Sequence, residues 1–177
     1  MSKRNVEEFR DLNANLISNC GITVGLINEG SYDDWKVTLT GPKDTPYING
    51  IFILNVHFPP EYPNKAPEVF FVTPIYHLNV NPTVPRNPGD ESLGHVCIST
   101  LNWWNPQYKM REVLLNIYSL FYSQNVDSPY GIERAKEYQE NEAVFFEKVK
   151  FFIKKYANPR NFSGNYDRSQ DWDFNLE

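Results

Sequence analysis

Apolar residues recur every three or four positions at the start of the chain. This spacing predicts an amphipathic helix over residues 2–18, whose apolar face consists of Val6, Phe9, Leu12, Leu16 and Ile17. Gly21 follows soon afterwards and is a typical helix stop. The other face is expected to be exposed, because its residues are charged: Lys3, Arg4, Glu7, Glu8, Arg10 and Asp11.

Alternation of apolar and polar residues then predicts three strands, over residues 21–27, 32–40 and 51–58. The short connections between them favour antiparallel pairing in a meander. Asn49-Gly50 is a strong turn signal just before the third strand. A fourth apolar run covers residues 69–72. It follows a segment that four prolines are expected to hold as a stiff, exposed loop: Pro59, Pro60, Pro63 and Pro67.

Residues 73–104 are expected to be mainly loop, because prolines recur through them, and loops of this length are usually functional or mobile. Helical spacing returns over residues 108–122, 132–139 and 141–156. The order of elements predicts an α+β fold. Its parts are an N-terminal helix, a four-stranded antiparallel meander sheet, a long active-site loop, a central helix and two C-terminal helices.

Composition narrows the class of protein. With 177 residues, 41% of them hydrophobic, we expect one core domain over residues 1–157 and a flexible tail over residues 158–177. The net charge of -5 argues against a nucleic-acid partner. The sequence contains no apolar run of about 18 residues, so no membrane span is expected. The two cysteines and three histidines lack the spacing of a metal site.

The start of the chain is charged and amphipathic, without the apolar core of a signal peptide. We therefore expect a cytoplasmic or nuclear protein with free thiols. A disulfide between Cys20 and Cys97 is the alternative.

Cys97 is the strongest candidate for chemistry. Its alternative is a buried, inert cysteine, which is a common fate of free thiols. Three features favour a reactive thiol: Gly94 lets the backbone turn closely, the segment lies in a loop region, and the polar run 76–79 precedes it. Sulfur is a good nucleophile and a good leaving group, so a reactive thiol at this position suits acyl transfer.

Five short motifs occur in order along the chain: Tyr62-Pro63-Asn64-Lys65-Ala66-Pro67, Ile75-Tyr76-His77-Leu78-Asn79-Val80, Gly94-His95-Val96-Cys97-Ile98, Trp104-Asn105-Pro106 and Asp127-Ser128-Pro129. Together with the flanking elements, they resemble the core of ubiquitin-conjugating enzymes over residues 3–156. The resemblance implies that Cys97 accepts ubiquitin from an activating enzyme as a thioester. A substrate lysine then attacks this thioester, usually with a ligase holding the complex. ATP is consumed upstream, so no cofactor and no metal are expected.

The same resemblance gives roles to four other residues. Asn79 either stabilises the oxyanion of the reaction or holds its own loop by hydrogen bonds, and His77 is interpreted as structural. Asp127 is expected to orient the attacking amine and accept its proton, with a turn or helix cap as the alternative. That alternative is favoured for Ser128, which stands where many members carry a second acidic residue.

The chain departs from the family pattern at three places. Leu78 replaces the usual proline between the motif's histidine and asparagine, so Asn79 is expected to be less well fixed. Asn79 and Cys97 are 18 positions apart, more than is usual in the family. The extra segment, residues 81–93, is a lid, a specificity element or a neutral insertion. Asn64 stands where an aromatic residue often anchors ligases, so ligase choice is expected to be unusual.

Partner surfaces are also implied by resemblance. The activating enzyme and ligases are expected to contact the first helix and two loops at the tip of the domain, through Lys3, Arg4, Pro63, Asn64, Trp104 and Pro106. Bound ubiquitin is expected to fold back on the exposed face of the central helix, at Leu115 and Ser119, although Leu115 as a core residue is the alternative.

Two other functions stay open. One is a conjugating enzyme for another ubiquitin-like modifier. The acidic charge favours ubiquitin, because the SUMO enzyme is typically basic. The other is a non-catalytic binding module on the same fold. The presence of both Cys97 and Asn79 argues against it, because such variants usually lack the cysteine.

Overall fold

The computed structural model describes residues 3–15, 21–82 and 93–159. Helix α1 (Lys3–Asn15) comes first, followed by four strands, β1 (Ile22–Leu26), β2 (Asp34–Thr40), β3 (Ile51–His57) and β4 (Glu68–Phe71). Four helices complete the chain: α2 (Ser99–Asn102), α3 (Met110–Ser119), α4 (Ile132–Glu140) and α5 (Glu142–Tyr156). The predicted α+β order is therefore confirmed.

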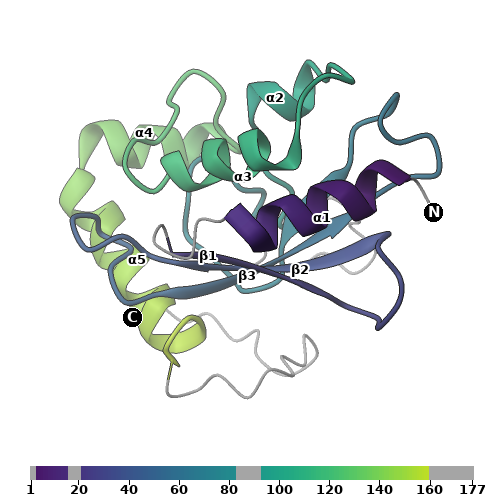
Figure 1. Cartoon of the computed structure of the whole chain (residues 1–177). Helices are drawn as coiled ribbons and strands as arrows, with labels where there is room; N and C mark the ends of the chain where they lie inside the picture. Colours follow the sequence, from purple (N-terminus) through teal and green to yellow (C-terminus); the bar gives the residue numbers. More distant parts are fainter. Residues whose placement is uncertain (1–2, 16–20, 83–92, 160–177) are drawn as a thin grey trace.

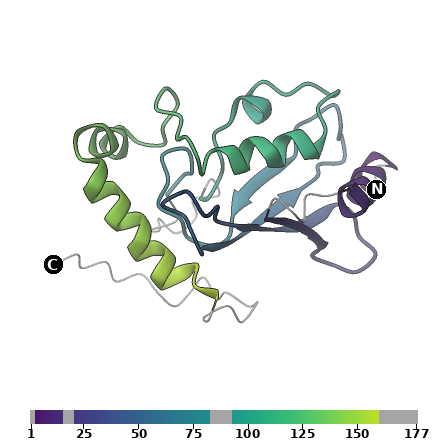
Figure 2. The same cartoon turned by 60° about the vertical axis from the view of Figure 1, so that its left-hand side comes forward.

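The four strands form a single antiparallel meander in the order β1-β2-β3-β4. Alternate residues of β2 point into the core, and Trp35, Val37 and Leu39 are completely buried. Helices α1 and α3 lie over one face of the sheet, whereas α4 and α5 lie at one end (Figure 1, Figure 2). A hydrogen bond from the Ile51 amide to the Ala157 carbonyl, 2.8 Å long, joins the end of α5 to the start of β3.

The charged face predicted for α1 is only partly exposed, and for Glu8 the prediction is wrong. Its side chain is buried, and the carboxylate accepts hydrogen bonds from the Tyr62 hydroxyl at 2.8 Å and the Met110 amide at 2.6 Å. Arg4 Nε donates to the same carboxylate at 2.5 Å. A carboxylate is tolerated inside a protein when its oxygens are satisfied in this way, and here it joins α1 to α3.

The proline-rich segment before β4 is a loop, as predicted, but it is not fully exposed. Pro59, Tyr62 and Pro67 are buried, and the Tyr62–Pro63 peptide bond is cis. The Tyr62 ring packs edge-on against Phe58 at 4.8 Å between centroids. Ring packing and the bond to Glu8 therefore hold this loop against the core.

The remaining boundaries differ in detail. Asn49, with φ 66°, lies near the end of a longer connection between β2 and β3 and is not part of a two-residue hairpin turn. The long loop contains the short helix α2, which the sequence pattern did not predict. Three predicted segments lie partly outside the described residues: residues 2 and 16–18 of the first helix, residues 83–92 of the insertion and residues 160–177 of the tail. Within the described part, none of the helices has the length and apolar character needed to cross a membrane.

Candidate active site

The segment that carries Cys97 is clamped between two other parts of the chain. On one side, the Phe71 amide donates to the Gly94 carbonyl at 2.8 Å. On the other, the Cys97 amide donates to the Asn79 carbonyl at 2.8 Å, and Val80 and Val96 form an isolated antiparallel bridge. These bonds fix the backbone of Cys97 beside that of Asn79.

Gly94 is required where this segment begins. Its φ is 79°, in the region that residues with a Cβ rarely adopt. A Cβ at this position would also lie only 2.3 Å from the Phe71 carbonyl oxygen. Close packing of the cysteine segment against β4 therefore depends on a glycine, as the sequence suggested.

Cys97 is a free cysteine and is only partly buried. The side-chain amide of Asn102, at the end of α2, donates to Cys97 Sγ at 3.3 Å. Burial, together with a smaller contribution from the nearby Cys97 thiol, raises the pKa of the Tyr130 hydroxyl. Cys20 lies outside the described residues. Among the residues that are described, no group of three or more Cys, His, Asp or Glu could hold a metal ion.

Asn79 is fully buried, and its side-chain amide is engaged on both sides. Nδ2 donates to the carbonyls of Asn125 at 2.8 Å and Ser128 at 3.0 Å, while Oδ1 accepts from the Asn125 amide at 2.9 Å. Of the two predicted roles, this geometry is that of a residue that holds the 125–128 loop. An oxyanion role would require one of these part-buried bonds to break.

His77 bonds within the same layer of loops. Its Nδ1 accepts from the Asn79 amide at 3.0 Å, so Nε2 carries the proton and donates to the Leu120 carbonyl at 3.1 Å. Burial lowers the pKa of His77 to about 4. The ring is therefore neutral at physiological pH and braces Asn79 against the end of α3.

Leu78 does not leave the loop loose, contrary to the expectation from the missing proline. Its amide, which a proline would lack, donates to Gln124 Oε1 at 2.9 Å. Its carbonyl accepts from the Tyr130 amide at 2.7 Å, and the side chain is fully buried. Two hydrogen bonds and packing thus replace the stiffness of the ring.

The Asp127 side chain is exposed, on the loop that Asn79 holds. Its amide donates to Asn125 Oδ1 at 3.0 Å, a turn of the kind that asparagine favours. Ser128 contributes its carbonyl to the bond with Asn79. Asn79 therefore links Cys97, through its backbone carbonyl, to the Asp127 loop, through its side-chain amide. Among the described residues, no bond orients the Asp127 carboxylate toward the sulfur.

The predicted partner surface at the tip is held together by hydrogen bonds. Trp104 Nε1 donates to the Pro63 carbonyl at 2.7 Å. Arg4 donates to the carbonyls of Pro106 and Tyr108, so this arginine is a structural link as well as a surface residue. The other predicted contacts, Lys3 and Asn64, are exposed.

Two further observations concern exposed apolar residues. On α3, Leu115 is 39% exposed, and Ser119 is exposed on the same helix. The alternative that Leu115 belongs to the core is therefore wrong. Trp103, beside α2, is 81% exposed. Sequence reasoning missed it, because only its neighbour Trp104 belongs to a recognisable motif.

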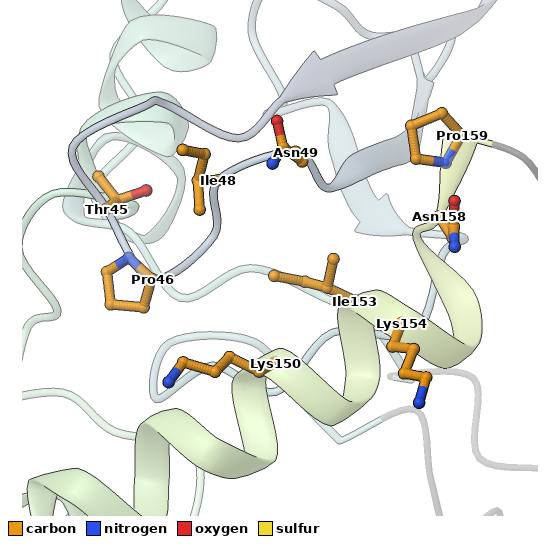
Figure 3. Close-up of a pocket in the computed structure, with 9 residues that line it drawn as sticks. All are labelled: Thr45, Pro46, Ile48, Asn49, Lys150, Ile153, Lys154, Asn158 and Pro159. Atoms are coloured by element: carbon orange, nitrogen blue, oxygen red, sulfur yellow. The ribbon is translucent and has the colours of Figure 1, made fainter.

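A hollow of about 510 Å³ lies elsewhere, between the β2–β3 connection and α5 (Figure 3). Pro46, Ile48 and Ile153 give it apolar walls, and Lys150 and Lys154 stand on the adjacent face of the helix. None of the described residues that line it is a cysteine, a histidine or an acid, and none of them belongs to the Cys97 site.

Comparison with protein families gives one assignment for this arrangement. Residues 4–153 match the family model described as ubiquitin-conjugating enzyme. The matched region runs from α1 into α5 and includes the cysteine segment, Asn79, the Asp127 loop and the tip loops.

Proposed function

The chain belongs to the ubiquitin-conjugating enzyme family, and from this premise we propose that it carries ubiquitin as a thioester on Cys97 and transfers it to a lysine. The family is one of conjugating transferases that work with ubiquitin, an activating enzyme and a ligase. The observation that supports Cys97 as the acceptor is its partly buried free thiol on a clamped segment. Such a sulfur is held in place yet open to an incoming carbonyl.

Two acyl exchanges make up the proposed reaction. In the first, the Cys97 thiolate attacks the thioester carbonyl on the activating enzyme; a new C–S bond forms and the activating enzyme's thiolate leaves. In the second, a lysine amine attacks the carbonyl on Cys97, a C–N bond forms, the C–S bond breaks, and the amine loses its proton to a base. Neither step requires an oxidant, a metal or a nucleotide on this chain, since ATP is used upstream.

Asp127 is proposed to help the second exchange. A lysine amine has a reference pKa of about 10.4, so at neutral pH it must lose a proton before it attacks. Asp127 is exposed and lies on the loop bonded to Asn79. A carboxylate there can attract the protonated amine and accept its proton, directly or through water.

The tip surface is proposed to receive the activating enzyme and ligases. The hydrogen bonds of Arg4 and Trp104 join α1 to both loops, so a partner would meet a single rigid surface. Asn64 offers this partner a polar side chain where an aromatic anchor is common, which supports a ligase that does not depend on that anchor.

A thioester assay tests the proposal. The protein is incubated with ubiquitin-activating enzyme, ATP and ubiquitin, and the products are separated without reductant. We expect a band shifted by one ubiquitin that is cleared by thiol, absent from Cys97→Ala and retained in Cys20→Ala, the only other cysteine of the chain. A shift with another ubiquitin-like modifier and its own activating enzyme, but none with ubiquitin, would establish the first alternative. No shift with any modifier would establish a binding module.

A further inference from the structure

The amide that faces the Cys97 sulfur belongs to Asn102. Its Nδ2 donates to Sγ at 3.3 Å, a normal length for a hydrogen bond to sulfur. An N–H donor in this position stabilises a thiolate more than a thiol, because charge-assisted hydrogen bonds are about twice as strong as neutral ones. The same donor stands beside any carbonyl group that is attached to this sulfur.

Asn79, the family's asparagine, is less free to act. Its Nδ2 already serves two carbonyls, those of Asn125 and Ser128, and the residue is 0% exposed. Turning this amide away would break these part-buried hydrogen bonds and leave the buried Asn79 side chain without its partners. Turning this amide toward the thioester would also release the loop that carries Asp127.

Asn102 can move without breaking bonds to a neighbouring loop. It ends α2, where its backbone amide donates to the Ile98 carbonyl at 3.0 Å, and the Trp103 amide closes the turn on the Ser99 carbonyl at 2.8 Å. The backbone is thus fixed five positions after Cys97, while the side chain is exposed. Rotation of the side chain alone can carry its N–H from the sulfur to an adjacent oxygen.

We propose that Asn102 is a catalytic residue of the thioester exchange, an inference that rests on the proposed function of Cys97. As the amine nitrogen bonds to the carbonyl carbon, the carbonyl oxygen gains negative charge and accepts the Asn102 N–H. When the C–S bond breaks, the electron pair stays on sulfur, and the N–H returns to the Cys97 thiolate. The amine's proton leaves to Asp127 or water, so the step is balanced.

The contact with sulfur is tested first, in the free protein. Alkylation of Cys97 by iodoacetamide is followed against pH in a Cys20→Ala background, for Asn102→Ala and for Asn102→Asp, which keeps the size but not the N–H donors. Both variants should move the pH–rate profile to higher pH and slow alkylation several-fold at pH 7. Asn13→Ala is the matched control, because among the described residues its amide bonds only the Phe9 carbonyl of its own helix. Its profile should coincide with the parent's.

Discharge of the ubiquitin thioester to free lysine is then measured in a single turnover. A well-placed oxyanion donor contributes about 10²–10³ in rate, and for this exposed one we expect a loss of about tenfold in Asn102→Ala and Asn102→Asp. The melting temperatures of both Asn102 variants should match that of the Asn13→Ala control. Asn79→Ala should slow discharge only together with a loss of thermal stability.

The outcomes distinguish failure of the Asn102 proposal from failure of the proposed function of Cys97. Unchanged alkylation and discharge rates in Asn102→Ala would overturn the proposal, as would a normal discharge rate combined with a shifted alkylation profile. A parent protein that takes up no ubiquitin would overturn the proposed function instead. In that case the alkylation profile still decides whether Asn102 stabilises the thiolate.

Discussion

His77 shows how burial fixes the state of a single side chain. The ring has a donor and an acceptor partner, the Leu120 carbonyl and the Asn79 amide. Only the neutral imidazole with its proton on Nε2 satisfies both. Burial disfavours the charged ring, and the positive charge of Arg134 adds a smaller effect in the same direction, so the pKa of His77 falls to about 4.

This depressed pKa predicts an acid-sensitive fold. Between pH 6.5 and 4, His77 binds a proton in the unfolded chain but not in the folded protein. The contribution of the neutral ring to the free energy of unfolding is therefore fully present above pH 6.5 and is lost as the pH falls toward 4. The loss expected from this group between pH 7 and pH 5 is about 2 kcal/mol, measured as the free energy of urea unfolding. NMR of the His77 ring should show no titration above pH 5 in the native state, and a ring that titrates near pH 6.5 would contradict this account.

At the scale of residues, the sequence predicts identities better than partners. His77 and Asn79 stand out because they fall in a motif near Cys97. Their hydrogen-bond partners Leu120 and Asn125 lie 43 and 46 positions further along, where no local pattern connects them. Asn102 carries no signal in the sequence, because an exposed asparagine is common and its contact with sulfur follows from the geometry of α2.

The elements are joined by buried polar groups as well as by the apolar core. Glu8 is the main example, since its carboxylate receives hydrogen bonds from α1, the proline-rich loop and the start of α3. The adjacent Glu7 is exposed and, within the part of the chain that the structure describes, pairs only with Lys3, at 3.8 Å. These neighbours therefore allow a matched comparison on one helix.

Replacement of Glu8 by alanine should destabilise the protein by about 3–5 kcal/mol, because Arg4 and the Met110 amide lose their buried acceptor. Glu7→Ala should change stability by less than about 0.5 kcal/mol, since exposed ion pairs contribute little. Urea unfolding of the two variants provides the measurement. Equal, small losses would show that the buried network does not hold α1 in place.

Gly94 links β4 to the cysteine segment, and a second pair of variants separates strain from crowding. Gly94→Ala combines a positive φ with a Cβ 2.3 Å from the Phe71 oxygen, whereas Gly30, with φ 82°, has nothing within 4 Å. Gly30→Ala should lose about 1–2 kcal/mol from backbone strain alone. Gly94→Ala should lose roughly 1–3 kcal/mol more from overpacking and should also slow thioester formation. Losses of the same size in thermal or urea unfolding would argue against crowding at Gly94.

Element order was predictable, whereas short elements and side-chain burial were not. The four strands lie where alternating or continuous apolar runs predicted them, as at Trp35–Leu39. Helices α3, α4 and α5 lie where the three-to-four spacing of apolar residues predicted them. Helix α2 has only four residues, too few for a period of 3.6 to be recognised. Burial of Glu8 depends on donors from Tyr62 and Met110, which local sequence does not reveal.

At the scale of the whole molecule, the proposed fold-back surface on α3 can be compared with another exposed apolar residue. Leu115 is exposed on α3, whereas Val113, Leu114 and Ile117 of the same helix are buried. Val144, on α5, is exposed to a similar extent, 42% against 39%. If ubiquitin folds back on α3, Leu115 should affect ubiquitin transfer and Val144 should not.

Leu115→Gln should leave thioester formation unchanged and slow lysine discharge roughly tenfold, which corresponds to about 1.4 kcal/mol of lost apolar contact. Val144→Gln should leave both rates unchanged. The measurement is single-turnover discharge of the purified thioester, with loading followed in parallel. A similar defect in both variants would indicate a general loss of structure and would contradict a specific fold-back surface.

The central claim, that Cys97 carries ubiquitin as a thioester, is tested most directly by intact-mass spectrometry of the charged protein under non-reducing, acidic conditions. The account predicts a mass increase of one ubiquitin less one water, located on the peptide that contains Cys97 and removed by thiol. An adduct that survives thiol treatment on a lysine, or no adduct at all with active activating enzyme and ATP, would contradict it.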